Sequence, residues 1–292
     1  MVDFAYEFKD LHQRLGYHTM ILNNTLWINY QRMVVPIGPV NKSYSVSAGD
    51  CKELLRYFSD CVLVRSTTGF AEYPERWYCV IRDRHISLEN MNSKDSRRQV
   101  RQGLENCLVR KIKSDTIKKE AWPVFLSAIK RYKHTPPTIT KISFEEKIIP
   151  DEFENIFHYW GVFEKATGRL IAYTHNDIYE NVEVNYAEVY YDPNFLRLSS
   201  GYALFYEMDK YYLENQKFMY VNDGFANLLH QTNIQEFLIR GFSYRKQPVG
   251  LNIHYRPIVG TCIRLSYPCR HVLGKISRPL AALYKQEEMS RF

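Results

Sequence analysis

The chain has 292 residues, of which 45% are apolar, 15% aromatic and 24% charged. This composition is that of an ordinary folded protein and excludes a disordered or fibrous chain. No stretch approaches the roughly 18 uninterrupted apolar residues of a membrane helix, so no membrane span is expected. The opening MVDFAYEFKD lacks the basic-then-apolar order of a signal peptide. Six scattered cysteines without a CxxC pair argue against structural zinc and disulfides, and a cytoplasmic location is expected.

The net charge of +7 conceals segments of opposite sign. Residues 1–135 hold 22 basic and 14 acidic residues, residues 136–240 hold 8 and 16, and residues 241–292 hold 9 and 2. Two interpretations stay open. Either the basic segments face a polyanion and the acidic one a cationic or amine-bearing molecule, or the charges are solvated faces whose signs happen to cluster.

The N-terminal third predicts strands and a helix joined by short connections. Asp50 is the expected N-cap of a helix at 51–58, whose apolar face holds Leu54, Leu55 and Phe58. Apolar runs predict four strands, at 26–30, 32–35, 61–64 and 77–81. The order of these elements predicts an open sheet covered by helices.

A basic helix and a strand follow. Ser93 or Asp95 is the expected N-cap of the helix and Gly103 its expected end, with Arg97 and Arg101 on one face. The strand is expected at 107–112. A basic helix can track phosphates, but this one lacks the aromatic residues that stack on single strands. Packing between domains, or framing of a substrate cleft, is therefore the favoured interpretation.

The second half predicts a strand, a hairpin, two more strands, a helix and a final strand. The strands are expected at 159–164, 170–179, 182–191 and 218–221. The hairpin turn is Ala166-Thr167-Gly168-Arg169, and the helix is expected at about 200–215.

Three segments in this order resemble the double-GNAT arrangement of the Fem-type aminoacyl transferases and their acetyltransferase-like relatives. Val35-Pro36-Ile37-Gly38-Pro39 resembles the family's Pro-Arg-Gly-Pro turn, with Ile at position 37 where Arg is frequent. The segment from Ser93 to Gly103 resembles its Ser-Lys-x-Arg-Arg-x-Ile-Arg-Lys-Gly helix, with Gln at position 102 where Lys is common. The segment from Asp192 to Tyr212 resembles the strand-4, loop and helix unit of a GNAT core.

The resemblance covers nearly the full length and implies an α/β (α+β) chain of two tandem GNAT-like domains. Each domain would be a mixed central sheet flanked by helices. The expected boundaries are 1–112 for the N-terminal domain and 113–292 for the C-terminal domain, which would carry an acyl-CoA site. The C-terminal tail is expected to pack back on the N-terminal domain.

A donor site is expected where strand 4 and strand 5 of the GNAT core separate. The start of the helix near Ser200 offers backbone N–H groups and a partial positive charge to a diphosphate. Gly201 allows close approach of the backbone, and Arg197 can pair with a phosphate. By resemblance, main-chain groups of Val189, Tyr190 and Tyr191 would hold the donor's pantetheine arm. The full set is Val189, Tyr190, Tyr191, Arg197, Leu198, Ser199, Ser200, Gly201, Tyr202, Arg245 and Lys246.

Catalysis would be direct attack of an amine on a thioester, which needs a base for the amine and an acid for the thiolate. Glu188, which alternates with Ala187 and Val189, is the first candidate base, and Asp223 is the second. Tyr211 or Tyr212 is the candidate acid. Arg245 and Lys246, in a segment that resembles a late Tyr-Arg-Phe-Lys segment of Fem-type chains, are assigned to donor phosphates. No spacing typical of metal ligands is present, so no metal is expected.

The resemblance implies an N-acyltransferase that uses acetyl-CoA or another acyl-CoA and a small-molecule or peptide amine acceptor. One alternative is transfer from an aminoacyl-tRNA to a cell-wall precursor. The basic N-terminal segment favours this alternative, and the lack of a long helical arm opposes it. Another alternative is a catalytically degenerate GNAT fold that only binds a partner.

Overall fold

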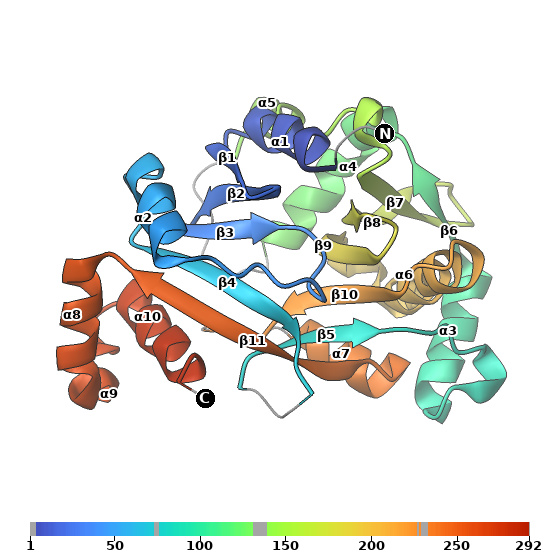
Figure 1. The fold of residues 1–292 in the computed structure, drawn as a ribbon. Coiled ribbons are helices and arrows are strands. Elements are labelled where there is room, and N and C mark those ends of the chain that lie inside the picture. The colour runs from blue at the N-terminus through green and yellow to red at the C-terminus, as the bar shows by residue number, and fades with distance from the viewer. Residues whose placement is uncertain (1–3, 73–75, 131–138, 227, 229–232, 292) are drawn as a thin grey trace. The chain divides into compact units, whose positions relative to one another are not determined.

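The computed structural model describes residues 4–72, 76–130, 139–226, 228 and 233–291. Its contacts divide the chain into two units, whose elements are labelled in Figure 1. The first unit comprises Met1–Val80, Phe225–Asn233 and Lys246–Phe292. The second comprises Ile81–Gly224 and Ile234–Arg245.

This division differs from the predicted boundary between residues 112 and 113. That boundary falls inside the second unit, at the end of strand β6 (Cys107–Ile112). The reason is that β6 pairs along its whole length with β7 (Phe157–Glu164), so the basic helix and its strand belong to the C-terminal core. The tail Lys246–Phe292 groups with the N-terminal residues.

The sheet of the first unit has the strand order β1-β2-β3-β4-β11. Its strands are β1 (Thr19–Leu22), β2 (Thr25–Tyr30), β3 (Met33–Ile37), β4 (Leu63–Phe70) and β11 (Arg245–Tyr255). Strands β3 and β4 are parallel, and the other neighbours are antiparallel. The sheet is therefore mixed, as expected. The strand expected at 77–81 is β5 (Tyr78–Arg82), which passes from the first unit into the second.

Helices cover this sheet, and one of them begins differently from the prediction. The helices are α1 (Phe4–Arg14), α2 (Ala48–Tyr57), α8 (Pro257–Ser266), α9 (Arg270–Leu273) and α10 (Arg278–Met289), with a 3₁₀ turn at Tyr267–Cys269. The N-cap of α2 is Ser47 and not Asp50. The Ser47 hydroxyl accepts from the Asp50 amide at 3.1 Å, and the Asp50 carboxylate accepts from the Ser47 amide at 2.9 Å. This is a capping box, in which the acidic residue occupies the third helical position.

The core of the first unit explains why α2 forms. Leu54 of α2 and Phe58, which directly follows the helix, pack on Trp27 and Val34 of the sheet, and all four side chains are buried. Burial of this apolar face stabilises the helix against the sheet.

The sheet of the second unit has the order β10-β9-β8-β7-β6. Besides β6 and β7 it contains β8 (Leu170–Tyr179), β9 (Glu183–Tyr191) and β10 (Tyr220–Phe225). Strands β6 to β9 are antiparallel neighbours, and β10 runs parallel to β9. All of these strands were expected from the sequence to within a few residues.

The helices of the second unit are α3 (Lys94–Asn106), α4 (Ser114–Ile129), α5 (Lys141–Glu145), α6 (Ser200–Asp209) and α7 (Asn233–Phe242). Short 3₁₀ segments lie at Leu88–Asn90, Asp151–Phe153 and Pro193–Leu198, and a π-helical segment, Lys210–Asn215, continues α6. Ser93 caps α3, but Gly103 does not end it. A Cβ at Gly103 would lie 2.6 Å from the carbonyl oxygen of Ser199, so this glycine allows α3 to approach α6 closely.

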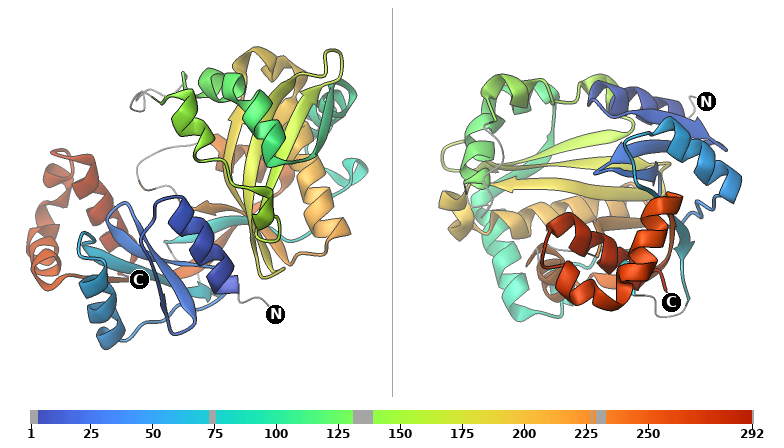
Figure 2. Two further views of the ribbon diagram at one scale, coloured as in Figure 1. Left: turned by 90° about the horizontal axis from the view of Figure 1, so that it is seen from above. Right: turned by 90° about the vertical axis from the view of Figure 1, so that its left-hand side faces the viewer.

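Helices α4 and α6 cover opposite faces of this sheet (Figure 2). The Tyr190 ring contacts Phe125 of α4, whereas the next residue, Tyr191, reaches Gly201 of α6. Consecutive strand residues point to opposite faces, so the two helices lie on different sides. In the described part of the chain, no helix is long and apolar enough to cross a bilayer.

Candidate functional site

Strands β9 and β10 are paired at one end and separate at the other. The last of three parallel pairs joins Asn222 to Asn185. Buried Glu183 holds this paired end by accepting a hydrogen bond from the Asn222 side chain at 2.8 Å. Beyond it, β9 continues to Tyr191 and β10 to Phe225 with no further pair between them in the described chain. We call this unpaired part of the two strands the fork.

The fork leaves backbone groups of β9 without a strand partner on the side of β10. These groups belong to the segment Val189–Tyr191, which was expected to hold a donor through its main chain. Unpaired N–H and C=O groups on a strand are ready hydrogen-bonding sites for an extended ligand. The separation of β9 and β10 therefore agrees with the separation of strands 4 and 5 that the resemblance implied.

Helix α6 begins beside the fork. Ser199 has a left-handed backbone (φ 57°, ψ 33°), and its carbonyl accepts from the amides of Tyr202 and Ala203 at 3.0 and 3.2 Å. Within the described chain, the amides of Ser200 and Gly201 have no hydrogen-bond partner. Free N–H groups at a helix start attract an anion.

The Ser199 hydroxyl does not face the fork. It hydrogen-bonds Gln99 of α3, and it lies 3.3 Å from the Gln102 side chain. Ser199 and Ser200 are both buried. The Ser199 side chain is thus committed to helix packing, and binding of a diphosphate by the backbone at the start of α6 stays a prediction.

Tyr191 lies between the fork and the start of α6. A Cβ at Gly201 would lie 3.3 Å from the Tyr191 hydroxyl. This hydroxyl is buried and has no hydrogen-bond partner in the described chain. Burial raises the pKa of Tyr191, so the group stays protonated and can donate. The side chain fills space that the prediction had assigned to a ligand.

Asp223 follows the last paired residue of β10 and faces the same side as Tyr191. Asn222 donates to Glu183 and lies on the α4 side, so the alternation of a strand turns Asp223 toward α6. Burial of the carboxyl raises the pKa of Asp223 to about 8, although part of the residue reaches solvent. The charge of Asp223 in turn contributes to the raised pKa of Tyr191.

Glu188 lies on the other face because of a bulge in β9. Glu188 pairs with His175, but the next pair along β8 is Asn176 with Tyr186, which leaves Ala187 as an extra residue. The Glu188 carboxylate accepts from the Tyr190 hydroxyl at 2.6 Å and lies 3.8 Å from His175. It is half exposed on the α4 side, whereas the start of α6 is on the opposite side.

Tyr211 is distant from the fork. It lies eleven residues beyond Ser200, which corresponds to about 16 Å along a helix. Its ring packs edge-on against Trp160, and the Lys111 ammonium lies 5.8 Å from its centre. The structure therefore does not bring Tyr211 together with Asp223, and the predicted acid role has no geometric support.

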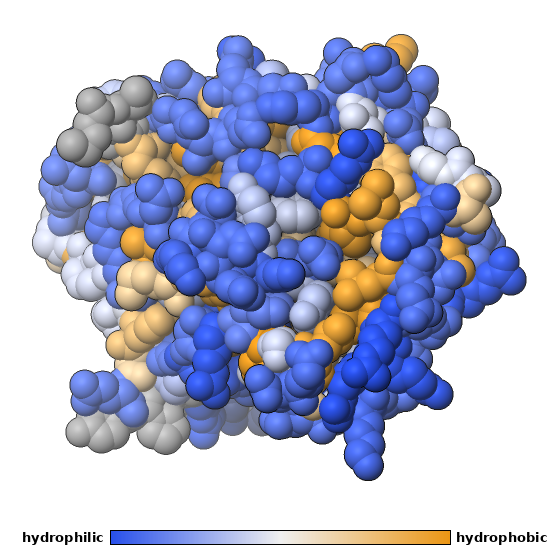
Figure 3. Space-filling view, turned by 90° about the vertical axis from the view of Figure 1, so that its right-hand side faces the viewer, coloured by the Kyte–Doolittle hydropathy of each residue, from blue (hydrophilic) through white to orange (hydrophobic). Residues whose placement is uncertain are grey.

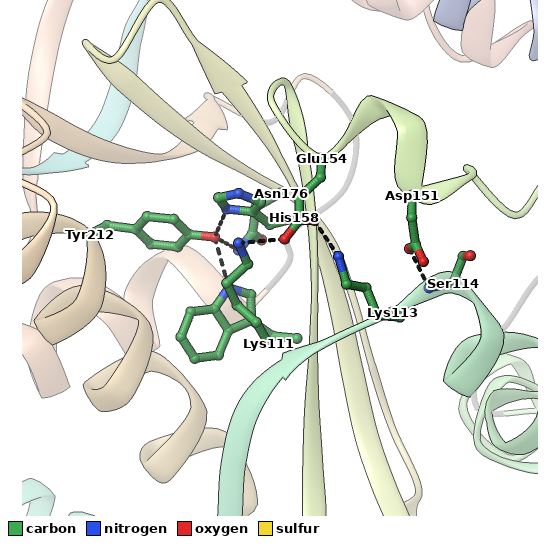
Figure 4. A network of polar contacts seen from close by, with 9 residues as sticks. Lys111, Lys113, Ser114, Asp151, Glu154, His158, Asn176 and Tyr212 are labelled. Carbon is green, nitrogen blue, oxygen red and sulfur yellow. Dashed lines mark hydrogen bonds and ion pairs between the residues drawn. The ribbon is translucent and has the colours of Figure 1, made fainter.

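Tyr212 belongs to a closed hydrogen-bond network (Figure 4). Its oxygen accepts from Trp160 at 2.7 Å and from Asn176 at 3.2 Å, so its own proton goes to Nδ1 of His158 at 2.9 Å. Burial lowers the pKa of His158 to about 4, which keeps this ring neutral and able to accept. Every polar group in the network is satisfied, so Tyr212 has a structural role.

An ion-pair cluster at the edge of the same network connects three elements of the second unit. Glu154 pairs with Lys111 at 3.2 Å and with Lys113, and both lysines lower the pKa of Glu154. Asp151 accepts from the amide of Ser114 at 2.8 Å and caps α4 (Figure 4). These contacts attach the segment before β7 to β6 and α4.

The remaining donor-site candidates near the fork have other contacts. Arg197 is exposed, and its carbonyl accepts from the Gln102 side chain at 3.0 Å. The Leu198 carbonyl accepts from the Cys107 thiol. The Tyr202 ring packs against Phe237. Among these three side chains, that of Arg197 is the most exposed and the most open to a ligand.

Arg245 is held away from the start of α6 within the second unit. Arg245 pairs with Asp83 at 2.8 Å and lines a cleft of about 840 Å³ in the second unit. Glu214 lines the same cleft, and it lies fourteen residues beyond Ser200, about 20 Å along the helix. The predicted contact of Arg245 with donor phosphates therefore has no geometric support. Lys246 belongs to the first unit, where its ammonium lies 4.9 Å from the centre of the Tyr78 ring, and its contact with donor phosphates stays a prediction.

The sequence did not predict the buried charges beside this cleft. Arg82 pairs with Asp209 at 2.5 Å, and both side chains are buried. Asp209 also accepts from the hydroxyls of Tyr186 at 3.0 Å and Tyr244 at 2.7 Å. One feature of the sequence could have indicated these buried charges: the charged run Arg82-Asp83-Arg84-His85, which ends an apolar strand.

No set of three His, Cys, Asp or Glu side chains able to hold a metal ion occurs among the described residues.

Comparison with known proteins identifies the fold. No family model and no curated protein matches the sequence. A crystal structure of FemX superposes with a TM-score of 0.57 at 9% identity, over 89% of this chain and 92% of FemX. The C-terminal domain of a lysylphosphatidylglycerol synthetase from Agrobacterium fabrum gives 0.54 at 11% identity, over 88% of this chain and 90% of that domain. The L-PGS structure from Bacillus licheniformis gives a TM-score of 0.53 at 12% identity, over 98% of this chain and 97% of that chain.

These three likenesses extend over most of each chain, and at these identities they concern the fold. The predicted α/β class and the predicted likeness to a Fem-type fold are confirmed at that level.

Proposed function

We propose that this chain is a GNAT-type transferase that moves an acyl group from an acyl-CoA to an amine at the fork. The observation that carries the proposal is the fork itself. The unpaired backbone of β9, the free amides of Ser200 and Gly201, and the carboxyl of Asp223 all lie at the place where two strands part. The fold that the chain shares with FemX supports a transferase.

The donor's diphosphate would bind the amides at the start of α6, with Arg197 as the adjacent cation. Its pantetheine arm would pair with the free edge of β9 as a short added strand. Both interactions use backbone groups, which are insensitive to side-chain identity. For this site to bind, the Tyr191 ring must turn aside or lie along the donor.

Asp223 is the base that this geometry favours. The amine nitrogen attacks the thioester carbonyl carbon, the carbon–sulfur bond breaks, and the amine proton passes to the Asp223 carboxylate. A carboxyl with a pKa of about 8 is well matched to proton transfer near neutral pH. Glu188 fits less well, because it lies on the face of the sheet opposite α6 and is already hydrogen-bonded to Tyr190.

Tyr191 is the acid that this geometry favours, in place of Tyr211. Its hydroxyl is unpartnered beside Gly201, and its raised pKa keeps the proton in place. It would donate a hydrogen bond to the oxygen or sulfur on which negative charge develops, as oxyanion donors do.

Donor binding is tested by thermal unfolding of the whole chain with and without acetyl-CoA. A ligand that binds only the native state raises the melting temperature, and the rise grows with the logarithm of its concentration above Kd. We expect a clear rise at millimolar acetyl-CoA, followed by release of free thiol when a panel of amines is added. No rise at that concentration would contradict the proposal.

The second candidate donor is an aminoacyl-tRNA, and one surface feature favours it. Lys94, Arg97, Arg98 and Arg101 of α3 line a shallow groove of about 500 Å³. On the face shown in Figure 3, hydrophilic side chains border a band of apolar ones. Salt-sensitive tRNA binding that weakens in an Arg97→Gln, Arg101→Gln variant would support this donor. Binding of neither donor would favour a catalytically degenerate GNAT fold.

A further inference from the structure

Six apolar residues form an exposed row near the C-terminus. They are Ile258, Cys262, Leu265, Cys269, Val272 and Ile276. We call this row the C-terminal stripe. The exposed fraction is 80% for Ile258, 79% for Leu265, 69% for Val272 and 72% for Ile276, and both cysteines are also exposed.

The spacing of the stripe places its members on one side of a helical segment. Successive members are four, three, four, three and four residues apart, a repeat that follows one face of a helix. The first five members lie in α8, the 3₁₀ turn and α9, which follow one another without a gap, and Ile276 lies in the turn directly after α9. Ile263 and Gly260 are buried and attach α8 to the first unit, so the stripe faces away from this core.

Leaving so much apolar surface in water is costly for a protein with no partner for it. Isolated exposed apolar residues are normal, but a contiguous patch marks an interaction site. Here four large aliphatic side chains, each more than two thirds exposed, lie in one row. The arrangement therefore requires an occupant.

The charge around the stripe identifies the chemistry of that occupant. Between residues 257 and 286 the chain has no Asp or Glu, whereas Arg264, Arg270, Lys275, Arg278 and Lys285 are basic. Arg264, Lys275 and Arg278 are exposed. A second copy of this face would place these cations against one another without an acid from the segment to pair with them. The occupant is therefore anionic as well as apolar.

We propose that the C-terminal stripe binds the surface of an anionic lipid bilayer. The helical segment would lie in the plane of the membrane, with Ile258, Leu265, Val272 and Ile276 below the headgroups and Arg264 and Lys275 beside lipid phosphates. An exposed apolar face flanked by Arg and Lys, without acids, is the pattern of helices that lie at this interface. The proposal rests on the stripe alone and is independent of the proposed transferase activity.

The test is sedimentation of the full chain with vesicles of phosphatidylcholine alone and with vesicles that also contain phosphatidylglycerol. We expect binding only to the phosphatidylglycerol vesicles, weakening with salt. Two variant sets separate the contributions, Leu265→Ser with Ile276→Ser for the apolar row and Arg264→Gln with Lys275→Gln for the cations. We expect the first to lose at least tenfold in partitioning and the second about fivefold for each charge removed.

The matched control is Ile142→Ser in α5, which removes an isoleucine of 70% exposure from the second unit. It should bind vesicles as the wild type does. Unchanged melting temperatures verify that all variants are folded, as expected for substitutions at exposed positions. Absence of wild-type binding would overturn the proposal, and so would equal loss in the Ile142→Ser control.

The two exposed cysteines give a second readout. Cys51, Cys61, Cys79 and Cys107 are buried, so an environment-sensitive maleimide should react with Cys262 and Cys269 in the native chain. We expect a blue shift of emission on addition of phosphatidylglycerol vesicles and none without them. A blue shift that depends only on protein concentration would show that the stripe binds a second copy, which would overturn the proposal.

Discussion

The two ends of the helix that begins at Ser200 differ in how their polar groups are satisfied. At the far end, Asp209 accepts from Arg82, Tyr186 and Tyr244, and the Tyr212 hydroxyl has three partners. At the start, the Tyr191 hydroxyl has none in the described chain.

Because an unpaired polar group is costly to bury, a folded protein normally pairs such groups. The satisfied end has the character of a structural network, and the unsatisfied end that of a binding site. The number of polar residues does not distinguish the two ends, because both are rich in them. The following predictions test whether this difference in pairing separates stability from function.

Arg82→Met should give the largest loss of stability. It leaves Asp209 buried without its cation, and breaking a buried ion pair from one side costs about 3–5 kcal/mol. Urea unfolding monitored by circular dichroism measures the free energy of unfolding. Arg98→Met is the control, because the Arg98–Asp95 pair is exposed on both sides and should matter little. Equal losses in the two variants would contradict the structural assignment.

Asp223→Asn should give the largest loss of activity. Removing a general base costs about 10²–10⁴-fold in turnover. The ionised carboxylate is the base, so wild-type turnover should rise with pH until Asp223 is deprotonated, near its pKa of about 8, and the variant should lack this rise. Glu188→Gln is the matched control and should retain both turnover and the pH profile. If instead Glu188→Gln lost turnover and Asp223→Asn retained it, Glu188 would be the base and Asp223 would not.

The same variant should be more stable than the wild type at neutral pH. Burial raises the pKa of Asp223 in the folded chain above its ordinary value of about 3.8, so folding favours the protonated carboxyl. Stability is therefore greatest below the unfolded pKa and falls as pH rises from about 4 to about 8. Asparagine has no charge to lose and avoids this fall. Chemical unfolding of both proteins at pH 5 and pH 8 should show a difference that grows with pH, and a constant difference would argue against a buried Asp223.

The strands were predictable because each is a local apolar run, and the site was only partly so. The predicted orientation of Glu188 assumed that side chains alternate strictly between the two faces of β9. The extra residue Ala187 interrupts this alternation and turns Glu188 to the face opposite that of Tyr186. No local pattern marks a bulge in this segment. The pairing of Arg82 with Asp209 joins residues 127 positions apart, so only the tertiary structure shows it. The sequence predicted a helix end at Gly103, because the residue that explains this glycine, Ser199, contacts it in the fold but is distant in sequence.

Tyr212→Phe should cost less than the loss of the ion pair. Removing the hydroxyl leaves Trp160, Asn176 and His158 each without one partner, and an unsatisfied buried group costs about 1–3 kcal/mol. Turnover should change little, since this hydroxyl lies at the far end of the helix. A large loss of turnover with unchanged stability would show that the network is catalytic.

Tyr191→Phe makes the same chemical change at the other end and should have the smallest effect on stability. The hydroxyl has no partner to lose in the described chain, so the free energy of unfolding should stay the same or rise slightly. If this hydroxyl donates to the charge that develops on the thioester, turnover should fall about tenfold or more, equivalent to about 1.4 kcal/mol in the transition state. Loss of one hydroxyl is therefore expected to lower stability but not turnover in Tyr212→Phe, and to lower turnover but not stability in Tyr191→Phe. Should Tyr191→Phe lose stability without losing turnover, the hydroxyl has a structural partner, and the contrast between the two ends of the helix does not separate structure from function.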